Sequence, residues 1–312
     1  MDPVTPSTVP PTAGPVAPTA ARDSATAVVL VVILGILMQA GSALSVLVID
    51  AVGVIEALWL RTFFAALILV VVRPGVVRWP ARGNRMVMVA LTASLLAMNL
   101  CFYEAISRAP VGIVVAVEFL GPLGIAVAGS RRLLDGVWVV LAGVGVVVLA
   151  DPSGSVPLAG LLFSLASAAC WAAFLLLAKA AVTRMQPLQV ATLMLIGSSV
   201  LLTPPLLATG LKVTGQGRAI LLGVAVALLS SALPYFLEMT ALKRVRASTY
   251  GVLLSLEPGI AAVMGLVILG QRLTLLEVAG IVAVAAAAAG ASWAAARMPR
   301  TRVHGAPEAQ ER

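Results

Sequence analysis

The chain has 312 residues, of which 61% are hydrophobic and only 11% are charged, whereas a soluble domain carries about 25% charged residues. With a mean hydropathy of +1.06, this composition indicates an integral membrane protein and excludes an ordinary soluble one. The formal net charge of +8 comes from arginines in short loops. Because these arginines form no basic face with interleaved aromatic residues, we expect no nucleic-acid partner.

In chain order, residues 1–26 form a Pro-, Thr- and Ala-rich tail that we expect to be disordered in the cytoplasm. Ten apolar segments follow, each close to the ~20 residues that cross a hydrocarbon core. The predicted membrane helices are residues 27–49, 53–72, 86–106, 110–129, 134–150, 157–179, 187–209, 218–241, 247–269 and 274–296. Residues 297–312 form a second tail. The predicted fold class is therefore all-α integral membrane, with ten transmembrane helices and a lipid bilayer as partner.

The distribution of Lys and Arg predicts the orientation. With a cytoplasmic N-terminus, sixteen basic residues lie inside: Arg22, Arg73, Arg78, Arg82, Arg85, Arg131, Arg132, Lys179, Arg184, Lys243, Arg244, Arg246, Arg297, Arg300, Arg302 and Arg312. Four lie outside: Arg108, Lys212, Arg218 and Arg272. The positive-inside rule therefore predicts that both termini are cytoplasmic.

The sequence also repeats itself at an offset of 136 residues, which relates 105–108 (AISR) to 241–244 (ALKR) and Pro122 to Pro258. The predicted repeats are residues 27–150 and 151–296, with five helices each. Similar halves with an odd number of crossings are inverted relative to each other. This inverted-repeat plan is typical of secondary transporters with a site near the midplane of the bilayer.

Four segments carry a resemblance to a known family: 99–106 (NLCFYEAI), 110–122 (PVGIVVAVEFLGP), 231–239 (SALPYFLEM) and 254–258 (LSLEP). They are similar to the drug/metabolite transporter (EamA-type) superfamily, and most similar to its threonine/homoserine exporter branch. The resemblance implies an inner (plasma) membrane carrier that exports small amino acids by alternating access, driven by the proton gradient. Gln271 departs from the pattern, since many members carry Glu there.

Two acids lie in the middle of predicted helices, Glu118 in 110–129 and Glu257 in 247–269. An ionised carboxylate at that depth costs a few kcal/mol, which indicates a function or a specific partner. Pro122 and Pro258 each remove a backbone hydrogen bond nearby, and so free a carbonyl in each half. Binding of a substrate amine or of the coupling proton and a structural role both remain open, and we expect one of the two acids to carry the coupling proton.

Arg61 stands alone in an apolar run, and a cation there needs an acid or a bound carboxylate as partner. The candidate acids are Glu118 and Glu257. Its guanidinium group suits a substrate carboxylate, which it can bind through two parallel hydrogen bonds. An internal salt bridge is the alternative.

Other residues within the predicted spans are candidates for a cavity lining or for interhelical contacts: Gln39, Asn99, Tyr103, Trp171 and Tyr235. Glu104 and Glu238 recur as Phe-x-Glu near helix ends, where they act as gates or simply reach water. We expect close helix contacts at Gly41, Gly121, Gly143, Gly145, Gly251, Gly259 and Gly265.

The only histidine, His304, lies in the C-terminal tail, so we expect neither a metal nor a cofactor, and no enzyme. An integral membrane enzyme remains the alternative of another class. A carrier of the same fold for an aromatic amino acid, a nucleoside or a drug is the closer rival. The solute, the coupling stoichiometry and the oligomeric state do not follow from the sequence.

Overall fold

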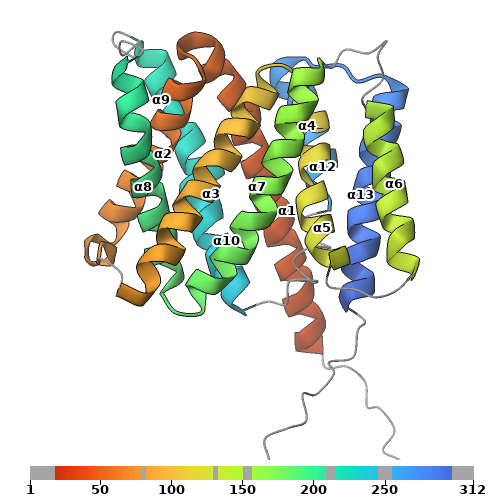
Figure 1. Ribbon diagram of the computed structural model, residues 1–312, viewed down its shortest axis with the longest axis horizontal. Coiled ribbons are helices and arrows are strands. Elements are labelled where there is room, and N and C mark those ends of the chain that lie inside the picture. Colours follow the sequence, from red (N-terminus) through yellow and green to blue (C-terminus); the bar gives the residue numbers. More distant parts are fainter. Residues whose placement is uncertain are drawn as a thin grey trace, which may run out of the picture.

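The computed structural model describes residues 18–78, 82–128, 133–149, 157–208, 216–244 and 255–296. The regular elements in these ranges are all helical: α1 (Pro18–Val52), α2 (Val54–Val72), η1 (Pro74–Val76), α3 (Arg82–Ile106), α4 (Val111–Glu118), α5 (Leu120–Ala128), α6 (Leu133–Leu149), α7 (Leu158–Val182), α8 (Pro187–Ala208), α9 (Gly217–Ala227), η2 (Leu228–Ala232), α10 (Leu233–Arg244), α12 (Glu257–Leu269) and α13 (Leu275–Ala296). They stand side by side in one bundle, and α1 begins at the end of the bundle where α13 finishes (Figure 1).

Six helices are long and apolar enough to cross a membrane: Ile33–Val52, Val54–Val72, Arg82–Ile106, Leu158–Val182, Pro187–Ala208 and Gly217–Thr240. Four shorter apolar helices accompany them: Val111–Ile125, Gly136–Leu149, Glu257–Leu269 and Leu275–Ala291. Each predicted segment therefore contains a helix in the described part of the chain. The structure agrees with a multi-pass helical membrane protein, and the number of ten crossings stays a prediction.

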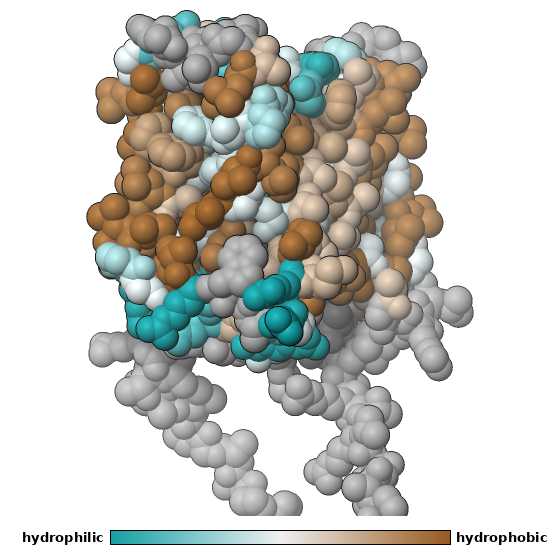
Figure 2. All heavy atoms as spheres, turned by 60° about the vertical axis from the view of Figure 1, so that its left-hand side comes forward, coloured by the Kyte–Doolittle hydropathy of each residue, from teal (hydrophilic) through white to brown (hydrophobic). Residues whose placement is uncertain are grey.

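The outer surface of the bundle is apolar. Val72, Met86, Val200 and Leu221 are each more than half exposed. In Figure 2 apolar residues cover most of the side of the bundle, and hydrophilic residues gather toward its lower rim. An exposed apolar belt of this extent fits hydrocarbon rather than water.

Three predicted helices differ from one continuous α-helix. The segment 110–129 divides into α4 and α5 at Phe119, because Pro122 has no N–H to donate to the carbonyl of Glu118. In 247–269 a turn precedes α12, which begins only at Glu257 with a proline in its first turn. The part of that segment from 247 to 254 lies outside the described residues. In 218–241 the π-helical turn η2 separates α9 from α10.

Helix packing joins the first half of the chain to the second. The helix α3 packs on α7, α1 packs on α9, η2 and α12, and α7 packs on α4 and α5. Further pairs between the halves include α2 with α8 and α9, α3 with α8, α4 with α12, and α6 with α13. The buried centre of the bundle is therefore lined by elements of both halves.

Some of the predicted glycine contacts are present. A side chain at Gly121 would overlap the Ala168 carbonyl of α7, and one at Gly41 would approach Ser230 of η2 to 2.8 Å. Close neighbours also surround Gly145 and Gly265. At Gly143 and Gly259 a Cβ atom would meet nothing within 4 Å, so the prediction of close contact is wrong there. Gly251 lies outside the described residues.

Candidate functional site

The centre of the bundle is occupied by Arg61 of α2, whose side chain is 4% exposed. Its Nε atom donates to the hydroxyl of Ser231 at 2.5 Å. Its Nη2 atom donates to the Ser230 carbonyl at 3.1 Å and to the Tyr235 hydroxyl at 3.3 Å. The guanidinium carbon lies 5.5 Å from the ring centroid of Tyr103 and 5.9 Å from that of Tyr235. Neutral groups and aromatic rings therefore surround this cation.

The π-helical turn η2 explains why Arg61 finds acceptors in an apolar bundle. A π-helical turn changes the i→i−4 backbone pattern and is frequent at functional sites. The Ser230 carbonyl and the Ser231 hydroxyl of this turn both face the guanidinium. Among the described residues Arg61 forms no salt bridge, although the charge of Glu118 is close enough to act on it.

Glu118 ends α4 and contacts the first helix of the second half. The Ser167 hydroxyl of α7 lies 2.5 Å from Oε1 of Glu118 and 3.0 Å from the carbonyl oxygen of Met98. A serine hydroxyl has one proton to donate. As the donor in both contacts, Ser167 shares this proton between the Glu118 carboxylate and the Met98 carbonyl.

Glu257 begins α12 and contacts the first helix of the first half. Its Oε2 atom accepts a hydrogen bond of 3.3 Å from Nε2 of Gln39. The side chains of Glu257 and Gln39 are 8% and 3% exposed. The charges of Glu238 and Glu118 both act on Glu257. Glu238 and Glu118 therefore both lie within electrostatic range of Glu257.

Hydrogen bonds of Asn99, Tyr103 and Tyr235 connect α3 with α10 and with α1. Asn99 donates to the Leu95 carbonyl at 2.8 Å and to the Tyr235 hydroxyl at 3.2 Å. Tyr103 donates to the hydroxyl of Ser45 in α1 at 2.9 Å. The structure thus joins three predicted site residues, Arg61, Asn99 and Tyr235, in one hydrogen-bonded network.

Trp171 lies beside this network rather than in it. Its ring is 8% exposed and packs edge-to-face on Phe119, with the ring centroids 5.2 Å apart. Phe119 is the residue that separates α4 from α5. Trp171 therefore packs against the helix interruption next to Glu118.

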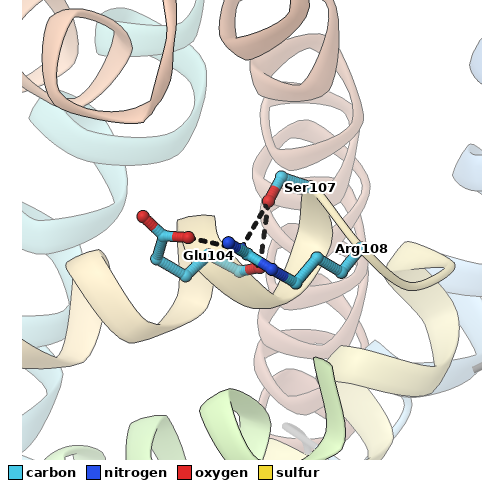
Figure 3. Close-up of polar contacts among 3 residues, drawn as sticks. All are labelled: Glu104, Ser107 and Arg108. Atoms are coloured by element: carbon cyan, nitrogen blue, oxygen red, sulfur yellow. Dashed lines mark hydrogen bonds and ion pairs between the residues drawn. The ribbon is translucent and has the colours of Figure 1, made fainter. Parts of the chain in front are cut away.

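The two Phe-x-Glu acids have different environments. Glu104 is paired with Arg108 near the end of α3, where Ser107 also contacts the guanidinium (Figure 3). The side chains of Arg108 and Glu104 are 38% and 30% exposed, which agrees with a solvated helix end. Glu238 on α10 is only 9% exposed and lies within electrostatic range of Glu257.

Sequence reasoning missed the serines. Ser45, Ser167, Ser230 and Ser231 are all buried and hydrogen-bonded to the predicted site residues or their neighbours. The sequence feature that could have indicated them is a serine within a predicted span, because its hydroxyl can serve as a hydrogen-bond partner for a charged residue on a neighbouring helix. It also missed Glu56 in the first turn of α2, which is 2% exposed and has one carboxylate oxygen without a hydrogen-bond partner.

The described residues contain no group of three His, Cys, Asp or Glu side chains that could hold a metal ion. What they do contain is a buried polar centre between apolar helices, with helix interruptions at α4/α5, at the start of α12 and at η2. Interrupted helices around a buried polar site are characteristic of membrane transport proteins.

Comparison with known proteins agrees with this class. Residues 158–293 match the EamA-like transporter family. The threonine/homoserine exporter RhtA of Salmonella typhimurium is 36% identical over 269 residues, covering 85% of this chain and 90% of that protein. RhtA of Escherichia coli K12 is 38% identical over 259 residues, covering 82% and 87%. The chain therefore belongs to the EamA-like transporter family.

One solved crystal structure shares the fold, with a TM-score of 0.65 at 18% identity. The match covers 87% of this chain and 98% of the other.

Proposed function

We propose that this protein is a secondary transporter that exports small amino acids of the threonine and homoserine kind across the inner membrane. It uses the inward proton gradient, by alternating access. The relatives at 36% and 38% identity are named threonine/homoserine exporters, and the polar centre offers both acids and a cation for a zwitterion.

The observation that carries the proposal is a pair of contacts that cross between the two halves. Glu118 of the first half is bonded to Ser167 on α7, the first helix of the second half. Glu257 of the second half is bonded to Gln39 on α1, the first helix of the first half. Each acid lies at a helix interruption. This crossed arrangement is expected when inverted repeats build one site between them.

The same contacts support the proposed domain organisation, with repeats at 27–150 and 151–296 between cytoplasmic tails at 1–26 and 297–312. The packing of α3 on α7 has its counterpart in that of α1 on α9 and η2. Likewise, α1 on α12 corresponds to α7 on α4 and α5. Ten crossings, with both termini in the cytoplasm, follow from this pairing and from the distribution of Lys and Arg.

Arg61 makes the two halves unlike, because it gives Glu118 and Glu257 different electrostatic surroundings. The charge of Arg61 acts on Glu118, whereas the acids Glu118 and Glu238 act on Glu257. We therefore assign the coupling proton to Glu257 first and to Glu118 second. The proton is taken up from the periplasmic side and released to the cytoplasm in exchange for substrate.

The test of the function is counterflow in proteoliposomes. Proteoliposomes that contain the purified protein are loaded with unlabelled substrate. Labelled threonine, homoserine, serine, alanine, phenylalanine or a nucleoside is then added outside. Accelerated exchange of threonine and homoserine is expected. Exchange of only phenylalanine or only the nucleoside would favour a carrier of the same fold for another solute. Chemical turnover that needs no gradient, or that requires a metal ion, would favour an enzyme.

The test of the coupling uses Glu257→Gln, which fixes a neutral side chain of nearly the same shape. We expect it to lose accumulation against a gradient while counterflow persists and becomes independent of pH between about 5 and 8. Glu104→Gln, in the exposed pair with Arg108, is the matched control and should keep accumulation. Normal accumulation in both Glu257→Gln and Glu118→Gln would show that the central acids are structural.

A further inference from the structure

The carbonyl oxygen of the Gln39 side chain has no hydrogen-bond partner, although Gln39 is 3% exposed and its amide nitrogen donates to Glu257. A buried acceptor without a donor is costly. The oxygen is held in place because the other half of the amide is committed to the carboxylate. The described interior therefore presents an unfilled acceptor directly beside an acid.

Turning the amide over does not solve the problem while Glu257 is ionised. The carbonyl oxygen would then face a carboxylate oxygen, and both are acceptors. When Glu257 is protonated, its O–H can donate to the Gln39 carbonyl, and the amide N–H groups then face the site. The orientation of Gln39 is thus tied to the protonation of Glu257.

The charges around this pair favour a cation. Glu238 of α10 and Glu118 of α4 act on Glu257, and the charge of Arg61 on α2 acts on Glu118. An ammonium group has three donors and can serve the Gln39 oxygen and the Glu257 carboxylate together. A carboxylate or a phosphate at this position would place acceptor against acceptor.

On the face of α1 that carries Gln39, the contact with α12 is close. One turn earlier on α1, a Cβ at Gly35 would lie 3.2 Å from Ile260 of α12. A primary ammonium fits such a contact better than a bulky or multiply substituted amine.

We propose that Gln39 and Glu257 form the subsite for the ammonium group of the substrate, and that protonation of Glu257 turns the Gln39 amide and expels that group. This inference rests on the proposed amino-acid export. Glu257 gains one proton from the periplasmic side as the ammonium leaves. With the proton on Glu257, Gln39 presents N–H donors, which repel a cation and prevent the substrate from returning.

The experiment measures the half-saturation concentration of L-threonine in counterflow between pH 5.5 and 8. The second probe is 2,3-dihydroxybutyrate, in which a hydroxyl replaces the ammonium group of threonine. For the unaltered protein, half-saturation by threonine should rise as the pH falls, because the proton and the ammonium compete. Gln39→Met, which has a similar length and no amide, should raise it about tenfold at pH 8. The preference for threonine over its analogue should shrink by a similar factor.

Two further variants complete the test. Gln189→Met on α8, where a half-buried Gln189 donates to the Arg78 carbonyl, controls for the substitution itself and should leave the threonine preference and its pH profile unchanged. Gln39→Glu keeps the acceptor atoms and cannot donate to ionised Glu257, so threonine binding should persist at pH 8 with an altered pH dependence. Gln39→Glu also decides the matter if Gln39→Met does not fold.

An unchanged threonine preference and pH profile in Gln39→Met, or an unchanged pH profile in Gln39→Glu, would overturn the inference. Absence of threonine exchange in the unaltered protein would instead contradict the proposed function. The two failures are therefore distinguishable.

Discussion

At the scale of single residues, Arg61 decides how the polar centre is built. Its bonds to Ser230, Ser231 and Tyr235 tie α2 to the π-helical turn and to α10. The planar guanidinium reaches these acceptors at once because its donors are fixed in one fork, which an ammonium group cannot reproduce. Arg61 thus combines a fixed position with a charge that acts on Glu118.

We predict that Arg61→Gln lowers threonine flux at least about tenfold, because hydrogen bonds to a charged donor contribute roughly 1.5–3 kcal/mol. Protein yield should change less than flux. Arg61→Lys should not recover transport, since it keeps the charge but not the fork. Flux per mole of reconstituted protein is the measurement, and normal flux in Arg61→Gln would contradict the role.

A double variant separates the two roles of this cation. If Arg61 serves mainly to balance an acid, Glu118→Gln in the Arg61→Gln background should restore flux. If it binds the substrate carboxylate or holds η2, no second change at Glu118 or Glu257 should help. The comparison of single and double variants in one reconstitution provides this answer.

At the scale of elements, the positions of the helices followed from the apolar segments, but the π-helical turn η2 did not. The π-helical turn leaves no trace in an apolar pattern, because Leu228 and Ala232 suit a membrane helix equally well in either geometry. The serine hydroxyls are a usable signal, but an ambiguous one. Ser45 and Ser230 each donate to the carbonyl four residues earlier, as isolated serines in helices commonly do.

The hydrogen-bond partners of Arg61 could not be predicted from the sequence either. Charge alone pointed to Glu118 and Glu257, whereas the structure supplies a backbone carbonyl and hydroxyl groups. Proline gave a better signal. Pro122 and Pro258 marked the two places where helices break beside an acid, because the loss of an N–H is a local property of the residue.

The close packing of α5 on α7 leads to a stability prediction. Gly121→Ala places a methyl group against the Ala168 carbonyl, and forcing backbones apart in a packed region costs about 1–3 kcal/mol. Gly124→Ala on the same helix meets nothing within 4 Å and should be nearly neutral. The measurement is the fraction of each variant that remains monodisperse in detergent after heating. Equal melting of the two variants would contradict the packing.

At the scale of the whole molecule, the proposed orientation makes a direct prediction about topology. Reporter fusions at Gly154 and Thr214 should lie in the periplasm, and fusions at Gly83 and at the C-terminus should lie in the cytoplasm. The expected readout is alkaline phosphatase activity for the first pair and fluorescence of a cytoplasmic reporter for the second. A periplasmic C-terminus would be incompatible with two inverted five-helix repeats.

The hydrogen bond between Asn99 and Tyr235 joins residues that are 136 positions apart, which is also the offset of the sequence repeat. Residues that are equivalent in two halves and touch each other must lie close to the axis that relates those halves. On the proposed rocking of one repeat against the other, atoms near that axis move least. The Asn99–Tyr235 contact would then be the fulcrum of the transport cycle, and it would persist in both the inward-open and outward-open states while the contacts near each membrane face are exchanged.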